Sequence, residues 1–451
     1  MQTKLFLAGA VCGLSMLLGC GGGPGSGFTP DGSNGGSDAA TQDEDPEIVF
    51  PDASVEAAPP CTGIKCQQVT CSSGKTTVSG TVYAPNGTLP LYNVIVYIPN
   101  APLDPIPSGA TCDACGAQVS GSPIVTALTD AKGNFVLENV PVGSDIPLVM
   151  QIGKWRRQIT IPTVAQCVDT KLTNAQQTRL PKNRNEGNIP KIAVTTGGCD
   201  PLACLLPKIG IEANEYGVSA ASPARVTMYA GSGGSGPSGI TPATNLWNNA
   251  AEMKKFDLAI FSCECSEYNN TKTNPGAVLD YVNSGGKIFG SHYHYTWFEN
   301  LIPQWQGTAS WGFGSGSTPA AVDTSFPKGK AMADWLTNQG LQPNNLPLTE
   351  TSQDVANVIA PTTRWLYASG GTTTHYLSFN APVGKKPDQQ CGKAVYGGMH
   401  ISSGGGSVST TFPAGCSASL SAQEKVLAFL FFDLSSCVQD DTKPPVPPVP
   451  N

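Results

Sequence analysis

Four histidines are the side chains of this 451-residue chain best suited to proton transfer or metal binding near neutral pH. Two of them, His292 and His294, would point to the same face of an extended segment. Glu264 and His400 follow other predicted strands whose ends could lie beside them. The sequence therefore predicts a site of Glu264, His292, His294 and His400. In it, either His292 and His294 bind a divalent metal ion, or a histidine acts as general base with Glu264 and His400 as further catalytic residues.

A structural role for the same segment stays open. The aromatic residues and His294 within 293–297 could pack and form hydrogen bonds at a crowded loop without any reaction. Ser291 lacks the sequence of a nucleophile elbow, so a serine hydrolase is not expected. Cys263 and Cys265, on the two sides of Glu264, are expected to be oxidised and structural.

Alternating strands and helices must position these residues. We expect strands over 189–195, 225–229, 256–263, 287–295, 375–380 and 393–396, and helices over 201–209, 275–283, 331–338 and 421–434. The last helix opens with Ser421 and Glu424 at capping-box spacing. Strands that alternate with helices predict a largely parallel sheet covered on both faces, with ligands beyond the carboxyl ends of its strands.

Three segments of this region carry a resemblance to a known family: FDLAIFSCE, VLDYVNSGGKIFGSHYHYTWF and CGKAVYGGMHIS. They resemble the class I glutamine-amidotransferase-like fold, and more closely its trehalose-utilisation (ThuA-like) branch. The resemblance implies an α/β three-layer flavodoxin-like domain over residues 186–438. Amidotransferases carry a cysteine nucleophile at the tight turn that Gly290-Ser291-His292 occupies here, so a thiol glutaminase is not expected. In the sugar-linked branch, histidines stand at positions that correspond to His292 and His400.

Residues 61–185 alternate in the manner of β-strands and predict an all-β sandwich of the Ig or transthyretin type. The segments SGTVYAPNGTLPLYNVIVYIP and TDAKGNFVLENVPVG resemble the carboxypeptidase regulatory-like (transthyretin-like) domain. The resemblance implies a structural or binding accessory without catalytic residues. Trp155, Arg156 and Arg157 could form a stacking and cationic patch for a sugar or an anionic polymer, unless the tryptophan lies in the core.

Thirteen cysteines follow residue 60, a number typical of disulfide-bonded exported proteins, and one of them must be left over. Asp200 is a good helix N-cap, and Pro201 suits the first helical position. Cys199 and Cys204 then occupy the two positions that a hydrophobic staple brings together. We expect a disulfide between Cys199 and Cys204.

The N-terminus predicts export. Lys4 is followed by an apolar run over 5–18 that is too short to cross a bilayer and ends in Leu-Leu-Gly-Cys20. This resembles a bacterial lipobox and implies a signal peptide over 1–19, a lipid anchor on Cys20, and sorting to the outer membrane. Residues 20–60 are rich in Gly and Ser and carry eight acidic but no basic residues, so we expect a disordered tether. Residues 439–451 form a Pro-rich tail.

The net charge of −7 comes from this tether, because the acidic and basic residues of 61–451 balance. Without a Lys/Arg cluster, nucleic acid is not an expected partner. We expect a cell-envelope lipoprotein that binds a glycan or an envelope protein without catalysis, and no cofactor other than a divalent metal ion. The alternative is a sugar-directed or hydrolytic enzyme that uses the histidines and Glu264.

Overall fold

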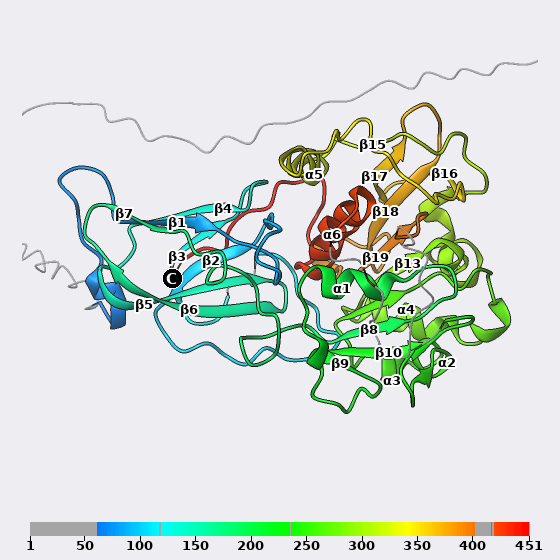
Figure 1. The fold of residues 1–451 in the computed structure, drawn as a ribbon, viewed down its shortest axis with the longest axis horizontal. Helices are drawn as coiled ribbons and strands as arrows, with labels where there is room; N and C mark the ends of the chain where they lie inside the picture. The colour runs from blue at the N-terminus through cyan, green and yellow to red at the C-terminus, as the bar shows by residue number, and fades with distance from the viewer. Residues whose placement is uncertain (1–60, 117–118, 235, 402–415, 417–418, 451) are drawn as a thin grey trace, which may run out of the picture. The chain divides into compact units, whose positions relative to one another are not determined.

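Two β-sheets account for residues 77–172 (Figure 1). The computed structural model describes residues 61–116, 119–234, 236–401, 416 and 419–450, all within a unit spanning Pro59–Asn451. One sheet has the strand order β4-β1-β7 and the other β3-β2-β5-β6. Their strands are β1 (Thr77–Thr81), β2 (Ile95–Pro99), β3 (Pro123–Leu128), β4 (Asn134–Glu138), β5 (Gly143–Ile152), β6 (Trp155–Val164) and β7 (Asp169–Leu172).

A ten-stranded sheet organises the rest of the described chain, with the order β11-β10-β8-β12-β13-β19-β18-β17-β15 and β9 paired to β10. Neighbours from β11 to β19 are parallel, and β18, β17 and β15 continue the sheet antiparallel. The strands are β8 (Ile192–Thr195), β9 (Tyr216–Gly217), β10 (Val226–Ala230), β11 (Thr241–Pro242), β12 (Leu258–Phe261), β13 (Lys287–Ser291), β15 (Ala320–Val322), β17 (Thr363–Ala368), β18 (Thr374–Ala381) and β19 (Gly392–Gly397). A separate antiparallel pair joins β14 (Ala309–Trp311) to β16 (Val355–Val358).

The α-helices are α1 (Leu205–Lys208), α2 (Thr244–Trp247), α3 (Ala250–Met253), α4 (Pro275–Asn283), α5 (Pro327–Asn338) and α6 (Ala422–Ser435). The predicted capping box is confirmed: the Ser421 side chain accepts from the Glu424 N–H, and the Glu424 carboxylate accepts from the Ser421 N–H. Several sheets together with helices confirm the predicted mixed α/β content. None of the helices in the described ranges is long and apolar enough to cross a membrane.

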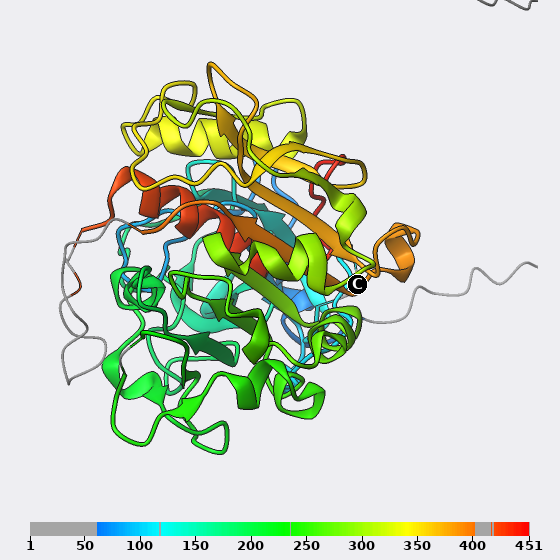
Figure 2. The same ribbon diagram turned by 90° about the vertical axis from the view of Figure 1, so that its right-hand side faces the viewer.

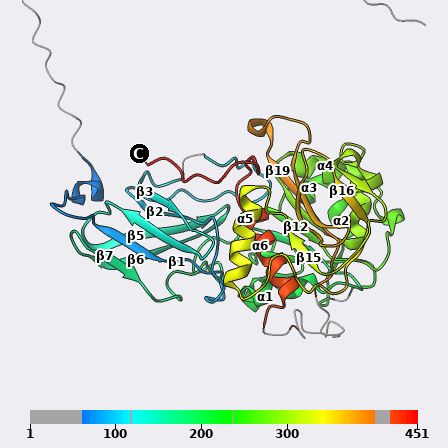
Figure 3. The same cartoon turned by 90° about the horizontal axis from the view of Figure 1, so that it is seen from above.

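Helix α6 is the central packing element. Its apolar run over 426–432 is buried all round, which a helix with one wet face would not show. The helix packs against β13 and β19 (Figure 2) and lies with α5 between the ten-stranded sheet and strands β1–β7 (Figure 3). Phe431 and Phe432 contact Trp155 of β6, and Phe429 stacks on Tyr92 with ring centroids 5.9 Å apart. One hydrophobic core therefore continues from the β-rich part into the α/β part.

Six disulfides secure the described chain: Cys61–Cys66, Cys71–Cys167, Cys112–Cys391, Cys115–Cys437, Cys199–Cys265 and Cys204–Cys416. The predicted Cys199–Cys204 pair is wrong. Asp200 does not cap a helix, because its carboxylate bonds elsewhere, and residues 202–204 form a 3-10 turn that precedes a short α1. The two cysteines therefore bond to distant segments and not to each other.

Four buried charges join α5, α6, β19 and the segment after α6. Lys328 lies 2.7 Å from Asp433 and 2.9 Å from Asp441, while Lys393 lies 2.7 Å and 3.0 Å from the same carboxylates. Each side chain is at most 7% exposed. Removal of one cation would leave a carboxylate buried without compensation, which costs more than the intact network gains.

We therefore predict that Lys328→Met lowers the free energy of unfolding by about 3–5 kcal/mol. Lys330→Met is the matched control, because Lys330 lies on the same helix, is 68% exposed and forms a surface ion pair with Asp334. It should change stability by less than about 0.5 kcal/mol. Urea unfolding of both variants measures the difference, and equal shifts would contradict a role for the buried network.

Candidate functional site

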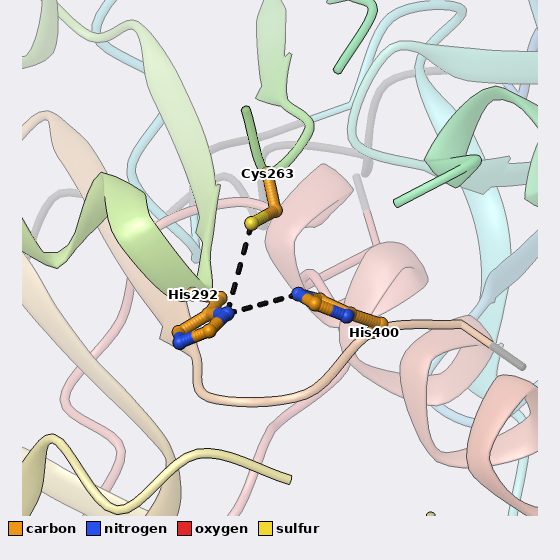
Figure 4. A group of neighbouring side chains, drawn as sticks. All are labelled: Cys263, His292 and His400. Atoms are coloured by element: carbon orange, nitrogen blue, oxygen red, sulfur yellow. Dashed lines mark hydrogen bonds between the residues drawn. The ribbon is translucent and has the colours of Figure 1, made fainter. Parts of the chain in front are cut away.

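Cys263, His292 and His400 come together where three neighbouring parallel strands end (Figure 4). Cys263 follows β12 by two residues, His292 follows β13 directly, and His400 follows β19 by three residues. The His292 Nδ1 atom lies 3.7 Å from the Cys263 sulfur and 2.9 Å from the His400 Nε2 atom. Each of the three residues offers one ligand atom, and these atoms lie within 4.8 Å of one another. This edge of the sheet is where ligands of parallel α/β folds bind.

A sharp turn projects His292 from the end of its strand. His292 has a φ of 41°, in the left-handed region that L-residues other than glycine rarely adopt, and it begins the 3-10 turn His292–Tyr295. Such a conformation costs on the order of 1–3 kcal/mol and persists only where surrounding contacts hold it. The ring of Tyr293 stacks on the His292 imidazole with centroids 4.2 Å apart.

Asp200 supplies contacts that hold both histidine segments. Its Oδ2 atom accepts a hydrogen bond from the hydroxyl of Ser291, the residue before His292. Its Oδ1 atom accepts from the N–H of Ile401, the residue after His400, at 3.0 Å. One buried carboxylate therefore joins the two imidazole-bearing segments beyond the ends of the paired strands β13 and β19, which makes Asp200 a positioning residue.

Each imidazole has one ring nitrogen in the cluster and the other turned toward a carboxylate. His292 Nε2 lies 3.8 Å from Asp354, and His400 Nδ1 lies 3.6 Å from Glu350. Asp354 is itself held by the hydroxyl of Tyr396, which donates at 2.8 Å. Each imidazole thus has a carboxylate near its outer nitrogen, at a distance longer than a hydrogen bond.

Burial controls the protonation of the cluster. It lowers the pKa of His292 to about 4, against the opposing effect of Asp354, and it lowers the pKa of His400 against Glu350. It raises the pKa of the Cys263 thiol to about 11. At neutral pH both imidazoles are uncharged and the thiol is protonated. Neutral imidazoles can bind a metal ion, whereas a protonated thiol is a poor nucleophile.

Two of the four predicted site residues do not join the cluster. His294 is buried, donates from Nε2 to the Ser262 carbonyl at 2.9 Å and accepts from the Trp297 indole at 3.2 Å. The prediction that His292 and His294 bind a metal together is wrong, because the turn at His292 breaks the extended geometry on which it relied. His294 has the packing role that the sequence left open.

Glu264 is also directed elsewhere. Its carboxylate lies 3.2 Å from the Lys272 ammonium and accepts from the Ser232 N–H at 2.6 Å. Glu264 therefore does not lie beside the histidines, contrary to its prediction as a catalytic residue of that site. Consecutive side chains of an extended segment point to opposite sides, and Cys263 takes the side of the cluster.

Cys263, Asp354, Glu350 and Asp200 are the site residues that sequence reasoning missed. Cys263 is unpaired and buried among the described cysteines, so its expected oxidation to a structural disulfide is wrong. The odd number of cysteines signalled one unpaired thiol without saying which. The two carboxylates reach the cluster from residues 350–354, where the sequence carries no motif for them.

The predicted sugar-binding patch on the β-rich part does not form. Trp155 is fully buried against Phe431 and Phe432 of α6. Arg156 donates to Ser120 and to the Asp104 carbonyl, while Arg157 donates to the carbonyls of Gln176 and Arg179. The tryptophan therefore offers no stacking face, and both guanidinium groups are occupied within the chain.

Asp200 gives the site a dependence of stability on pH. Burial raises its pKa from 3.8 to about 7, against the hydrogen bonds from Ser291 and Ile401. The folded state therefore holds a proton that the unfolded state has lost between about pH 4 and pH 7, and stability falls as pH rises through this window, by at most about 1.4 kcal/mol per pH unit.

We predict that Asp200→Asn reduces this fall. The amide can accept from Ile401 and donate to Ser291, as the protonated acid can, but it cannot ionise. Urea unfolding at a series of pH values from 4 to 8 measures both profiles. Parallel profiles for the two proteins would contradict the prediction.

Comparisons with known proteins yield no family for this chain. No family model and no curated protein matches it. Two crystal structures of interface mutants of a type II cohesin–X–dockerin complex from Acetivibrio cellulolyticus match with 15% identity, 33% of this chain, 78% of that chain and a TM-score of 0.16. A 9R-lipoxygenase from Cyanothece matches with 15% identity, 24% of this chain, 19% of that chain and a TM-score of 0.13. Likenesses at these TM-scores carry no argument about fold or function.

Proposed function

We propose that this protein is an exported bacterial lipoprotein whose α/β part, residues 186–438, hydrolyses a sugar-containing substrate. The observation that carries the proposal is the convergence of Cys263, His292 and His400 at the carboxyl ends of β12, β13 and β19. The resemblance to the ThuA-like branch of the class I amidotransferase-like fold, with a flavodoxin-like three-layer arrangement, supports the sugar as substrate. The β-rich part, residues 61–185, serves as a carboxypeptidase regulatory-like accessory domain.

Water is the nucleophile that this site favours. The Ser291 hydroxyl is buried and donates to Asp200, so it is not directed at a substrate. The Cys263 thiol is buried and protonated, unlike the thiolate of a glutaminase. The side chains of His292 and His400 remain 20% and 14% exposed, and Glu350 is 42% exposed, so a small substrate and water can reach them.

The site is better suited to a reaction than to binding alone. Burying imidazoles and carboxylates together costs free energy of folding. Titratable groups with strongly shifted pKa values are concentrated at catalytic sites. The non-catalytic binding role expected from the sequence rested in part on Trp155, Arg156 and Arg157, whose groups are used inside the chain. Binding without turnover is therefore an outcome of the test and not our proposal.

The test is a hydrolysis screen with the purified full chain. A panel of aryl glycosides, acetylated sugars and cell-wall glycans is incubated with the protein, and products are identified by mass spectrometry. We expect turnover that falls by about 100-fold or more in His292→Ala and in His400→Ala, and that persists in the exposed surface variant Lys330→Ala. Glycan binding without product in the folded wild type would contradict the enzyme.

The proposed lipid anchor is tested separately, because Cys20 lies outside the described residues. Acyl chains contribute about 0.8 kcal/mol of membrane affinity per buried CH₂, so loss of the acylated thiol should release the protein. We predict that Cys20→Ser moves the protein from the outer-membrane fraction to the soluble fraction and abolishes fatty-acid labelling. Cys12→Ser, a thiol within the apolar run, should change neither. Membrane retention of Cys20→Ser without label would contradict the anchor.

A further inference from the structure

We infer that Cys263, His292 and His400 bind one divalent transition-metal ion of the zinc type with an open coordination position. The inference rests on the proposed function only in that it places the ion at the same centre. It stands on the spacing of the ligand atoms, on the protons that the imidazoles can carry, and on the chemistry of the unpaired cysteine.

Two of the three spacings among the ligand atoms suit a tetrahedral ion, and all three atoms lie within 4.8 Å of one another. Zinc binds sulfur at about 2.3 Å and imidazole nitrogen at about 2.0–2.1 Å, so ligand atoms of a tetrahedral site lie roughly 3.3–3.6 Å from one another. His292 Nδ1 lies 3.7 Å from the Cys263 sulfur and 2.9 Å from His400 Nε2. Both distances are within about 0.5 Å of those expected values. The three residues follow adjacent strands in fixed register, so the sheet sets their separation.

The available protons favour an ion between the imidazoles. A neutral imidazole has a single N–H, and the contact between His292 Nδ1 and His400 Nε2 requires one of the rings to donate. That ring then turns a bare nitrogen toward its carboxylate, Asp354 or Glu350. With a cation in the cluster, both inner nitrogens become ligands and both outer N–H groups face a carboxylate. Carboxylates in this position orient metal-bound histidines.

Cys263 supplies the third ligand. The other twelve cysteines after residue 60 are paired, and Cys263 keeps a buried thiol, although the expected compartment is oxidising. A cation offsets the cost of a buried thiolate. Thiolate with imidazole selects zinc or copper over magnesium or calcium.

Partial exposure of both histidines leaves one side of the cluster open to solvent, which favours zinc with a fourth position for water. Water bound there would have a pKa lowered toward about 7 and is the nucleophile that the proposed hydrolysis needs.

The experiment is metal binding by the chelator-treated full chain, purified without a histidine tag. Zinc content is measured by mass spectrometry, and cobalt(II) substitutes for zinc as a spectroscopic probe. We expect one equivalent of zinc, and for the cobalt form a thiolate-to-metal charge-transfer band in the near ultraviolet with tetrahedral bands in the visible region. The band should disappear in Cys263→Ser.

Matched variants separate this site from adventitious binding. His292→Ala and His400→Ala should lose at least about 100-fold in zinc affinity, and Asp354→Asn about 10–100-fold through the orientation of His292. His375→Gln is the histidine control, because its imidazole donates to the Ser317 carbonyl and lies outside the cluster. It should bind zinc as the wild type does. Far-ultraviolet circular dichroism verifies that each variant is folded. The cobalt spectrum of the wild type tests the site even if a variant does not fold.

The outcomes separate this inference from the proposed function. Zinc at one equivalent with the cobalt thiolate band, but no hydrolysis of any substrate, supports the metal site and contradicts the enzyme. Hydrolysis by a folded wild type that binds no zinc, if it is lost in His292→Ala, overturns the metal site and leaves the enzyme standing. A folded wild type that binds no zinc, or that binds only copper with an intense visible thiolate band, overturns the inference as stated.

Discussion

The candidate site depends on one buried carboxylate. Asp200 accepts from Ser291 and from the Ile401 N–H, so it connects the turn that carries His292 to the segment that carries His400. The pairing of β13 with β19 and a longer hydrogen bond from the Ser291 hydroxyl to the Met399 carbonyl, at 3.4 Å, hold the same two segments. The connection has a cost, because a fully buried acid resists ionisation, as its raised pKa shows. Burial of Asp200 therefore lowers the free energy of unfolding at neutral pH, although this residue helps to position the imidazoles.

The scaffold around this site is held by burial on several sides. Helix α6 is buried between β13 and β19 on one side and Trp155 on the other, so a different part of the chain covers each side of the helix. The disulfides Cys112–Cys391 and Cys115–Cys437 join the loop after β2 to the α/β part. The ion pair of Lys154 with Asp257, at 2.7 Å, adds a buried polar contact across the same boundary. Carboxyl ends of strands that belong to such a core are rigid enough to hold a three-residue cluster.

Local patterns in the sequence predicted secondary-structure elements better than they predicted tertiary contacts. The helix predicted over 275–283 coincides with α4, and the capping box at Ser421 forms as expected, because both depend on neighbouring residues. Strands β14–β17 were not predicted. Asp354 and Glu350 were not predicted either, because they reach the site through tertiary contacts that no local sequence pattern encodes.

Of the four residues predicted to form one site, the structure brings His292 and His400 together and directs His294 and Glu264 elsewhere. The failure has one physical cause in each case. His292 adopts a left-handed backbone conformation, so the segment is not extended there and His292 and His294 do not point to the same face. The segment after β12 turns Glu264 toward Lys272, and only knowledge of that pairing could have excluded it.

The disulfide Cys199–Cys265 explains why Cys263 and not its neighbour carries the thiol. Cys265 is exposed and lies two residues beyond Cys263, and its bond to Cys199 fastens the loop after β12 to the residue next to Asp200. The Cys199 N–H also donates to the Cys263 carbonyl at 3.2 Å, so the covalent and hydrogen bonds hold the same two segments. Oxidation thus uses the cysteine that solvent can reach, and burial protects the one that faces the imidazoles. A buried thiol kept reduced beside two imidazoles is the arrangement on which the proposed zinc site rests, and the same disulfide that secures the two segments preserves it.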